Sequence, residues 1–146
     1  MTTDERTGGC LCKNIRYALT GEPVWVVQCF CRDCQLATGT GHTTIAAFDF
    51  DQQASVQGRP KEYSTQGDSG GTVTRHFCEN CGSRLFTTSN LSGPLAIFQC
   101  GTLDEPGSVT PTSAIYMKDR IGWDHVEPSL RQYEMMNPDI VYKADD

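Results

Sequence analysis

The sequence predicts a mainly β fold, and three observations support that prediction. The chain has 146 residues, which suits one domain of residues 1–146 on the usual scale of roughly 100–200 residues per domain. No window longer than about ten residues repeats its apolar side chains with the 3.6-residue period of a helix. Short runs rich in β-branched and aromatic residues recur instead, with Gly and Pro between them.

The expected strands follow one another at short intervals along the chain. They are residues 15–19, 24–28, 43–48, 72–77 and 95–99. A short helix is expected after Cys31, through residues 34–37, and a single helical turn at residues 128–133. Residues 66–71 are rich in turn formers, which predicts either a hairpin connection or an active-site loop. The first seven residues and residues 143–146 are expected to be solvated ends.

The net charge and the hydropathy of the chain argue against two classes of function, nucleic-acid binding and membrane association. The formal net charge is −6 and the pI is about 4.9, which argues against nucleic-acid binding because Lys and Arg supply most of the affinity for phosphate. No apolar run approaches the ~20 residues that span a bilayer, so no membrane partner is expected. The polar N-terminus lacks the apolar region of a signal peptide, which predicts a cytoplasmic, reducing compartment.

The cysteines are the most informative residues. There are eight, and seven of them fall into three closely spaced groups: Cys10-x-Cys12, Cys29-x-Cys31-x-x-Cys34 and Cys78-x-x-Cys81. In a reducing compartment, clustered cysteines more often bind metal or perform chemistry than form disulfides. Cys100 stands alone in an apolar run, and we expect a small buried thiol there.

Four cysteines have the spacing of a closed structural zinc site: Cys10, Cys12, Cys78 and Cys81. Gly82 follows the last of them, where such turns often need a positive φ. Residues 8–9 are both Gly, which lets the backbone bend before the first pair. The alternative is a set of buried or disulfide-linked thiols.

Three further cysteines remain as ligands for a second ion: Cys29, Cys31 and Cys34. Three protein ligands with an open fourth position are typical of a catalytic zinc, and the open position can take water or a thiolate. Two alternatives stay open. In the first, the group is a second structural site with Cys100 as its fourth ligand. In the second, two of its cysteines form a redox pair.

Several motifs together resemble the glutathione-dependent formaldehyde-activating enzyme family, which includes centromere protein V-like proteins. They are Gly8-Gly9-Cys10-x-Cys12, Ile15-Arg16-Tyr17, Cys29-x-Cys31-x-x-Cys34, Phe77-Cys78-x-x-Cys81-Gly82 and Gly101-Thr102-Leu103-Asp104-Glu105-Pro106. Residues 114–123, which end in Trp123, are similar to a late aromatic segment of the family. The resemblance covers about residues 7–133.

The resemblance implies a β-tent fold, in which several short-stranded antiparallel sheets are held by a structural zinc. It implies the same division of the cysteines into a structural and a catalytic zinc site. We expect two zinc sites, with the second open to partial occupancy. The founding activity of the family joins formaldehyde to glutathione. The chain departs from the family pattern at Phe30, where relatives often have His, and at Lys13, where many have Gly.

The leading functional hypothesis is therefore a zinc-dependent carbon–sulfur lyase. Its partners would be glutathione or a similar small thiol and a small electrophile, such as formaldehyde. Glutathione is anionic, so cationic side chains are expected near the second cysteine group, and the candidates are Arg32 and Arg75. The alternative is a non-catalytic zinc-binding interaction module, or a thiol-carrier or redox module, which metal analysis would distinguish.

Overall fold

The computed structural model describes residues 5–67 and 70–140, and it confirms the mainly β fold class. Strands take up 41% of the described residues and helices 15%. One sheet has three strands in the order β1-β2-β5 and is antiparallel throughout. Its strands are β1 (Glu5–Gly9), β2 (Arg16–Thr20) and β5 (Ala54–Gln57).

The other sheet has eight strands in the order β11-β10-β3-β4-β9-β8-β7-β6. Its strands are β11 (Arg131–Gln132), β10 (Ser113–Ile115), β3 (Trp25–Cys29), β4 (Thr43–Asp49), β9 (Leu95–Gln99), β8 (Arg84–Ser89), β7 (Thr72–Phe77) and β6 (Lys61–Gln66). Neighbouring strands are antiparallel from β3 to β6, whereas β10 runs parallel to both β3 and β11. The expectation of antiparallel sheets is therefore wrong at this edge, where a long connection brings β10 back beside β3.

The helices are short. They are α1 (Arg32–Thr38), α2 (Phe50–Gln53), and three 3-10 turns, η1 (Cys100–Thr102), η2 (Pro106–Ser108) and η3 (Met117–Asp119). Within the described part of the chain, no helix combines the length and the apolar character needed to cross a bilayer.

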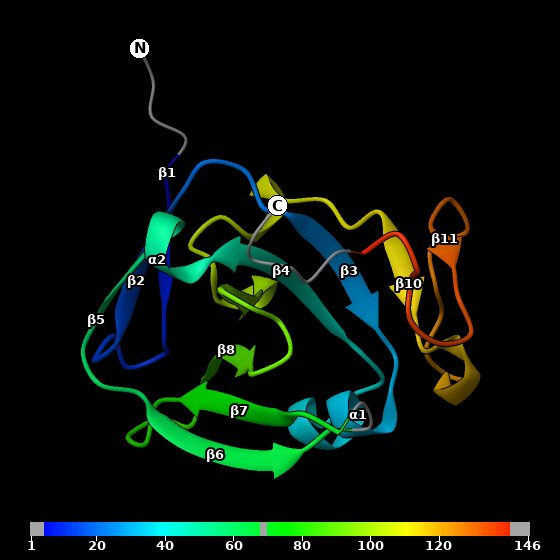
Figure 1. The fold of residues 1–146 in the computed structure, drawn as a ribbon, viewed down its shortest axis with the longest axis horizontal. Coiled ribbons are helices and arrows are strands. Elements are labelled where there is room, and N and C mark those ends of the chain that lie inside the picture. Colours follow the sequence, from blue (N-terminus) through cyan, green and yellow to red (C-terminus); the bar gives the residue numbers. More distant parts are fainter. Residues whose placement is uncertain (1–4, 68–69, 141–146) are drawn as a thin grey trace.

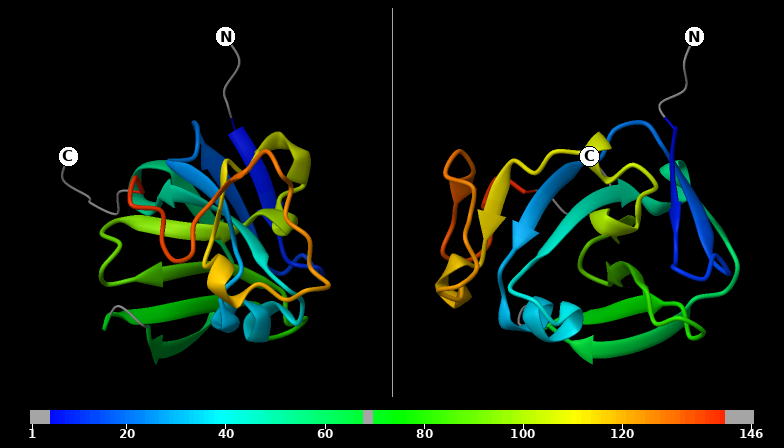
Figure 2. Two further views of the ribbon diagram at one scale, coloured as in Figure 1. Left: turned by 90° about the vertical axis from the view of Figure 1, so that its right-hand side faces the viewer. Right: turned by 180° about the vertical axis from the view of Figure 1, so that it is seen from behind.

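The strands surround the core from several sides (Figure 1). The three-stranded sheet stands at one side, β3 and β4 slope across the top, and β6 and β7 run along the bottom. The segment that carries β10 and β11 lies outside β3, at the end opposite the three-stranded sheet, and the reverse view in Figure 2 agrees with this arrangement. Helix α1 lies where the ends of β3 and β4 come near β6 and β7.

The sequence located most of the central elements. Strands β7 and β9 begin and end where predicted, β2, β3 and β4 are shifted or extended by one residue, and α1 includes the expected helix. Residues 66–71 join β6 to β7, and Gly67 N–H donates to the Gly71 carbonyl (2.7 Å), which confirms the hairpin interpretation.

Two expectations for the ends of the chain are wrong. Residues 5–7 are part of β1, whose backbone pairs with β2 and is therefore not a solvated end. Residues 128–133 form a turn, closed by Leu130 N–H and the Glu127 carbonyl (3.0 Å), and then β11. The proposed end at residues 143–146 lies outside the described residues.

The main core packs aromatic side chains from both sheets. Phe98 of β9 lies at its centre, with its ring centroid 4.8 Å from that of Tyr17, 4.9 Å from that of Phe86 and 6.1 Å from that of Phe48. Since Tyr17 belongs to the three-stranded sheet and the others to the eight-stranded sheet, this cluster joins the two. Buried aromatic pairs of this kind contribute about 0.5–1.5 kcal/mol each beyond the area they bury.

The two consecutive glycines at the end of β1 are required for close packing. The expectation of a sharp bend is wrong here, because both residues lie within the strand. A Cβ on Gly9 would lie 2.4 Å from the Ile15 carbonyl oxygen, and one on Gly8 would lie 2.5 Å from that of Thr102.

We therefore expect Gly9→Ala to destabilise the fold by about 3 kcal/mol, because backbone must move to admit the methyl group. Thermal unfolding measures the effect. Gly107→Ala is the matched control, since a Cβ there meets nothing within 4 Å. Equal melting temperatures for the two variants would contradict this account of the β1 packing.

Candidate functional site

The first cysteine group lies where the two sheets meet. Cys10 and Cys12 follow β1, and Cys78 and Cys81 follow β7, so the group brings together residues from both sheets. The four sulfur atoms lie within 4.8 Å of one another. A metal ion held by all four would therefore tie the three-stranded sheet to the eight-stranded sheet.

The distances within this group fit zinc. Cys12 Sγ lies 3.6 Å from Cys10 Sγ and 3.7 Å from Cys78 Sγ. Four sulfurs at the zinc–sulfur distance of about 2.3 Å occupy the corners of a tetrahedron with edges of about 3.8 Å. The hydroxyl of Ser83 hydrogen-bonds to Cys81 Sγ and lowers the pKa of that thiol to about 5, which favours the thiolate that a metal requires.

Two tight turns present these thiols. Gly82 has φ +81°, as expected from its position after Cys81. Lys13 follows the first pair and has φ +70°, a left-handed conformation that costs a non-glycine residue about 1–2 kcal/mol. The Ile15 N–H then donates to Cys10 Sγ (3.3 Å), which holds the turn around the sulfur.

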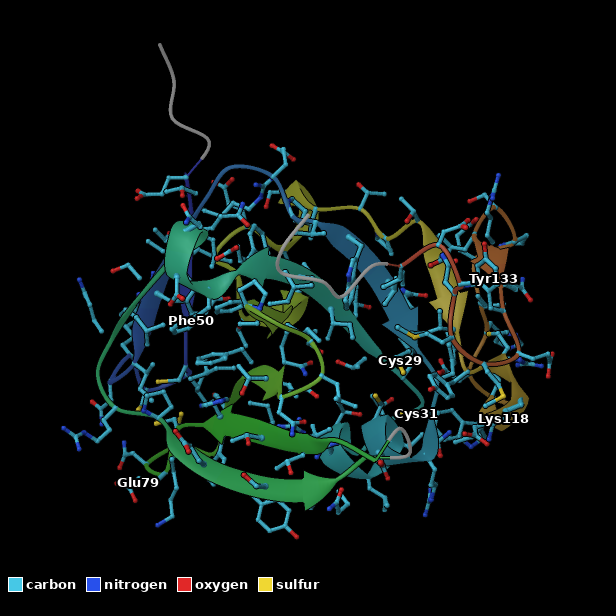
Figure 3. The ribbon with its side chains drawn as sticks, viewed as in Figure 1. Cys29, Cys31, Phe50, Glu79, Lys118 and Tyr133 are labelled. Carbon is cyan, nitrogen blue, oxygen red and sulfur yellow. The ribbon has the colours of Figure 1, made fainter. Side chains whose placement is uncertain are left out.

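The second cysteine group lies at the junction of β3 and α1. Cys29 is the last residue of β3, Cys31 is the N-cap of α1, and Cys34 lies in the first turn of α1. Cys31 Sγ is 3.2 Å from Cys34 Sγ and accepts a hydrogen bond from the Cys34 N–H (3.3 Å). The three sulfurs lie within 4.8 Å of one another, and Figure 3 shows Cys29 and Cys31 side by side at this junction.

Only one of the three thiols in this group is favoured to carry a negative charge. Hydrogen bonds from Cys29 and Cys34 lower the pKa of Cys31 to about 3. The hydrogen bond to Cys31 raises the pKa of Cys29 to about 12, and hydrogen bonds to Cys29 and Cys31 raise that of Cys34. A metal cation bound among the sulfurs would allow all three thiols to be thiolates at once, because metal ligation deprotonates thiols outright.

The two groups are separate sites. Figure 3 shows Glu79, which lies between Cys78 and Cys81 in the sequence, at the lower left of the molecule and well away from Cys29 and Cys31. Cys100 is 4% exposed and belongs to the main core, and burial raises the pKa of its thiol to about 11. It is a buried thiol, as expected, and the structure does not bring it to the second group.

Three hydrogen bonds hold α1 in place, and one of them comes from the eight-stranded sheet. The buried Gln35 side chain donates to the carbonyl oxygens of Phe30 (3.1 Å) and Asp119 (2.9 Å). Arg84 Nη1 of β8 donates to the carbonyl of Ala37 near the end of the helix (2.7 Å). These contacts fix Cys31 and Cys34 above one face of the eight-stranded sheet.

Cross-strand register shows which residues share that face, because directly paired residues and residues two apart in a strand point to the same side. Cys29 pairs with Thr43, Ile45 pairs with Gln99, Ile97 pairs with Thr87, and Thr87 pairs with Arg75. One row of side chains therefore crosses five strands, from Cys29 in β3 to Arg75 in β7.

Two neighbouring cavities lie between this face and α1. The inner cavity, of about 100 Å³, is lined by Cys34, Thr43, Gln99 and other residues of the row. The outer groove, of about 620 Å³, is lined by both polar and apolar side chains, including Leu36, Tyr63 and Phe77. Ala37, Arg75 and Arg84 line both spaces, so the outer groove leads toward Cys34.

The two arginines that the sequence singled out lie in different surroundings. Arg75 is half-buried and lines both cavities. Arg32 is exposed on α1, donates to Gln35 Oε1 (3.0 Å) and is not among the residues that line the two cavities. Phe30 is fully buried and stacks on His42, with ring centroids 4.6 Å apart, and it is not among the residues that line the two cavities.

The sequence reasoning missed Arg84, Thr43 and Gln99 as residues around the second cysteine group. Arg84 is half-buried three positions after Cys81, and it pairs with Phe77 across the β7–β8 turn. The register of β7 and β8 shifts between His76 and Phe77, and this irregularity places Arg84 opposite Phe77. A regular hairpin read from the sequence would not have predicted this pairing. Thr43 and Gln99 required the register of β4 and β9, which no local pattern gives.

The fold and the site define a class of protein: a mainly β domain with one closed group of four cysteines and one open group of three beside a cavity. The family model for the glutathione-dependent formaldehyde-activating enzyme matches residues 5–119, which is 115 of the 146 residues. The chain therefore belongs to this family. Trp123 lies beyond the matched range and is exposed. A search of curated proteins found no match.

Proposed function

We propose that this protein is a zinc-dependent carbon–sulfur lyase that acts on adducts of a glutathione-type thiol with a small electrophile, formaldehyde being the family's example. The observation that carries the proposal is the open group of three thiols, of which Cys34 lines the inner cavity. Family membership supports the link to glutathione and formaldehyde. Cys10, Cys12, Cys78 and Cys81 would hold a structural zinc, and Cys29, Cys31 and Cys34 a catalytic one that is partly occupied.

The reaction forms or breaks one carbon–sulfur bond. In the forming direction, the thiol sulfur attacks the carbonyl carbon, the C=O π pair moves to oxygen, and that oxygen receives the proton that the thiol lost. Bound zinc would lower the pKa of the substrate thiol and so favour its thiolate form. The side chains around Cys34 would position the reactants: the Thr43 hydroxyl donates to Gln99 Oε1 on the cavity wall, which leaves the Gln99 amide N–H to donate to a carbonyl oxygen.

Cationic side chains would hold the anionic part of the substrate. Arg75 lines both cavities and Arg32 lies on the exposed side of α1, so both are proposed contacts. All eight cysteines are free in the structure, which supports a reducing, cytoplasmic setting for this chemistry.

Calorimetric titration tests thiol capture. The zinc-loaded protein should bind glutathione at least about tenfold more tightly than S-methylglutathione, because only glutathione has a free thiol for the open position and soft thiolates suit zinc. Arg32→Ala should weaken binding if Arg32 touches the substrate. Equal affinities for the two ligands would remove thiol capture from the mechanism, and binding without formaldehyde turnover would exclude this electrophile.

The 3.2 Å contact between the Cys31 and Cys34 sulfurs supports a second candidate, a thiol-carrier or redox module. In that case the second group would hold no zinc, and its thiols would be oxidised and reduced in turn. One zinc per chain after zinc loading, together with thiol oxidation at Cys31 and Cys34, would favour this candidate over the lyase.

A further inference from the structure

Two arginines meet where the inner cavity opens into the outer groove. Arg75 lies in β7 and Arg84 in the neighbouring strand β8, and both line both spaces. The guanidinium groups are close enough for the positive charge of Arg75 to lower the pKa of Arg84, together with the stronger effect of burial. Cys34 of the second cysteine group lines the inner cavity together with both arginines.

Neither arginine has a carboxylate partner among residues 5–67 and 70–140. The ion pairs of that part of the chain involve other residues, although the protein has 18 acidic side chains and only 12 Lys and Arg. Each guanidinium carries five N–H donors. The hydrogen bonds found use one from Arg75, to Thr65 Oγ1 (3.3 Å), and one from Arg84, to the Ala37 carbonyl (2.7 Å).

Two half-buried like charges without a counter-ion are unfavourable unless an anion binds between them. We propose that Arg75 and Arg84 form a carboxylate-binding site that positions the thiol substrate, an inference that rests on the proposed function of the second cysteine group. Arginine suits this role because its planar fork pairs with a carboxylate through two parallel hydrogen bonds.

This site sets the orientation of the substrate. With a carboxylate held at the arginine pair, the thiol end of the molecule lies in the inner cavity beside Cys34. The rest of the molecule then lies in the outer groove, against Leu36, Tyr63 and Phe77. The protein would therefore select thiols that bear a carboxylate and would bind small neutral thiols weakly.

The test compares three ligands on zinc-loaded protein by calorimetry: glutathione, its diethyl ester, which lacks both carboxylates, and S-methylglutathione, which lacks the free thiol. The variants are Arg75→Gln, Arg84→Gln and Arg84→Lys, with Arg131→Gln as the matched control on the exposed strand β11. Zinc content and thermal unfolding are measured for each variant, because Arg84 also holds the end of α1.

We expect Arg75→Gln and Arg84→Gln each to weaken glutathione binding about tenfold or more, while Arg131→Gln leaves it unchanged. Arg84→Lys should recover part of the loss. The diethyl ester should bind the wild-type protein weakly, and its affinity should not change in the arginine variants. Equal losses for glutathione and diester, no loss at all, or no binding of glutathione by wild type would overturn the carboxylate site.

The S-methyl ligand separates this inference from the proposed function. If S-methylglutathione binds as tightly as glutathione, and both lose affinity in the arginine variants, the carboxylate site stands and thiol capture fails. The opposite result is that every arginine variant binds glutathione with wild-type affinity and still prefers it to S-methylglutathione by the same ratio as wild type. Thiol capture then stands and the carboxylate site fails.

Discussion

Replacing Cys81 with serine should abolish cooperative folding. The four cysteines of the first group come from the ends of strands in both sheets. The loss of one zinc ligand therefore weakens the link that zinc makes between the two sheets. Zinc binding to such sites contributes on the order of 10–16 kcal/mol in small peptides, which is as large as the ~5–15 kcal/mol that keeps a typical domain folded. We expect insoluble protein or a state without fixed tertiary packing, measured by near-UV circular dichroism and thermal unfolding.

Cys100→Ala is the control for this experiment. It removes a buried thiol that lies outside both cysteine groups, so it should leave a cooperative transition at a somewhat lower temperature. Removal of zinc from the wild type with a chelator should reproduce the Cys81→Ser state. A Cys81→Ser protein as cooperative and as heat-stable as wild type would show that this group does not hold the sheets together.

Replacing Cys34 with serine should leave a folded protein without activity. Cys34 lines the inner cavity, and its group lies at the junction of β3 and α1 and shares no residue with the four-cysteine group between the two sheets. The loss of one of three ligands should release the second zinc and reduce lyase turnover by at least about a hundredfold, the size of loss that follows removal of a key group from a metal or reaction centre. Turnover and far-UV circular dichroism measure the two effects separately.

Cys31→Ser extends the same test. Cys31 also caps α1, but serine is itself a preferred N-cap residue, so the loss of activity is expected with little change in melting temperature. Global unfolding of both variants would show instead that the second group is structural. Full activity in either variant would exclude its cysteine from the reaction.

The sequence predicted the features that depend on short spacing. Cys78-x-x-Cys81 and Cys29-x-Cys31-x-x-Cys34 place their thiols together through local turns, and the structure brings both groups together as predicted. Strands β7 and β9 were also located, because β-branched and aromatic residues crowd into runs bounded by Gly, Pro or Cys. The need of a closed zinc site for four ligands then linked the two halves of the four-cysteine group, which are 66 residues apart at Cys12 and Cys78.

Features that depend on strand pairing could not be read from the sequence. Strand β1 has the sequence Glu-Arg-Thr-Gly-Gly, which has little strand propensity, and its pairing with β2 overrides that. The parallel pairing of β10 with β3 joins segments more than eighty residues apart. The row of side chains from Cys29 to Arg75 depends on the register of five strands, and a slip of one residue would turn each side chain to the other face.

Counting zinc on the wild type and on Cys34→Ser tests the central claim most directly. Both proteins are saturated with zinc, freed of excess metal by gel filtration, and analysed for metal per chain with and without glutathione. We predict two zinc ions per folded wild-type chain, one in Cys34→Ser, and retention of both by wild type in glutathione. One zinc in both proteins would contradict a metal site at Cys29, Cys31 and Cys34, and with it the zinc-dependent lyase.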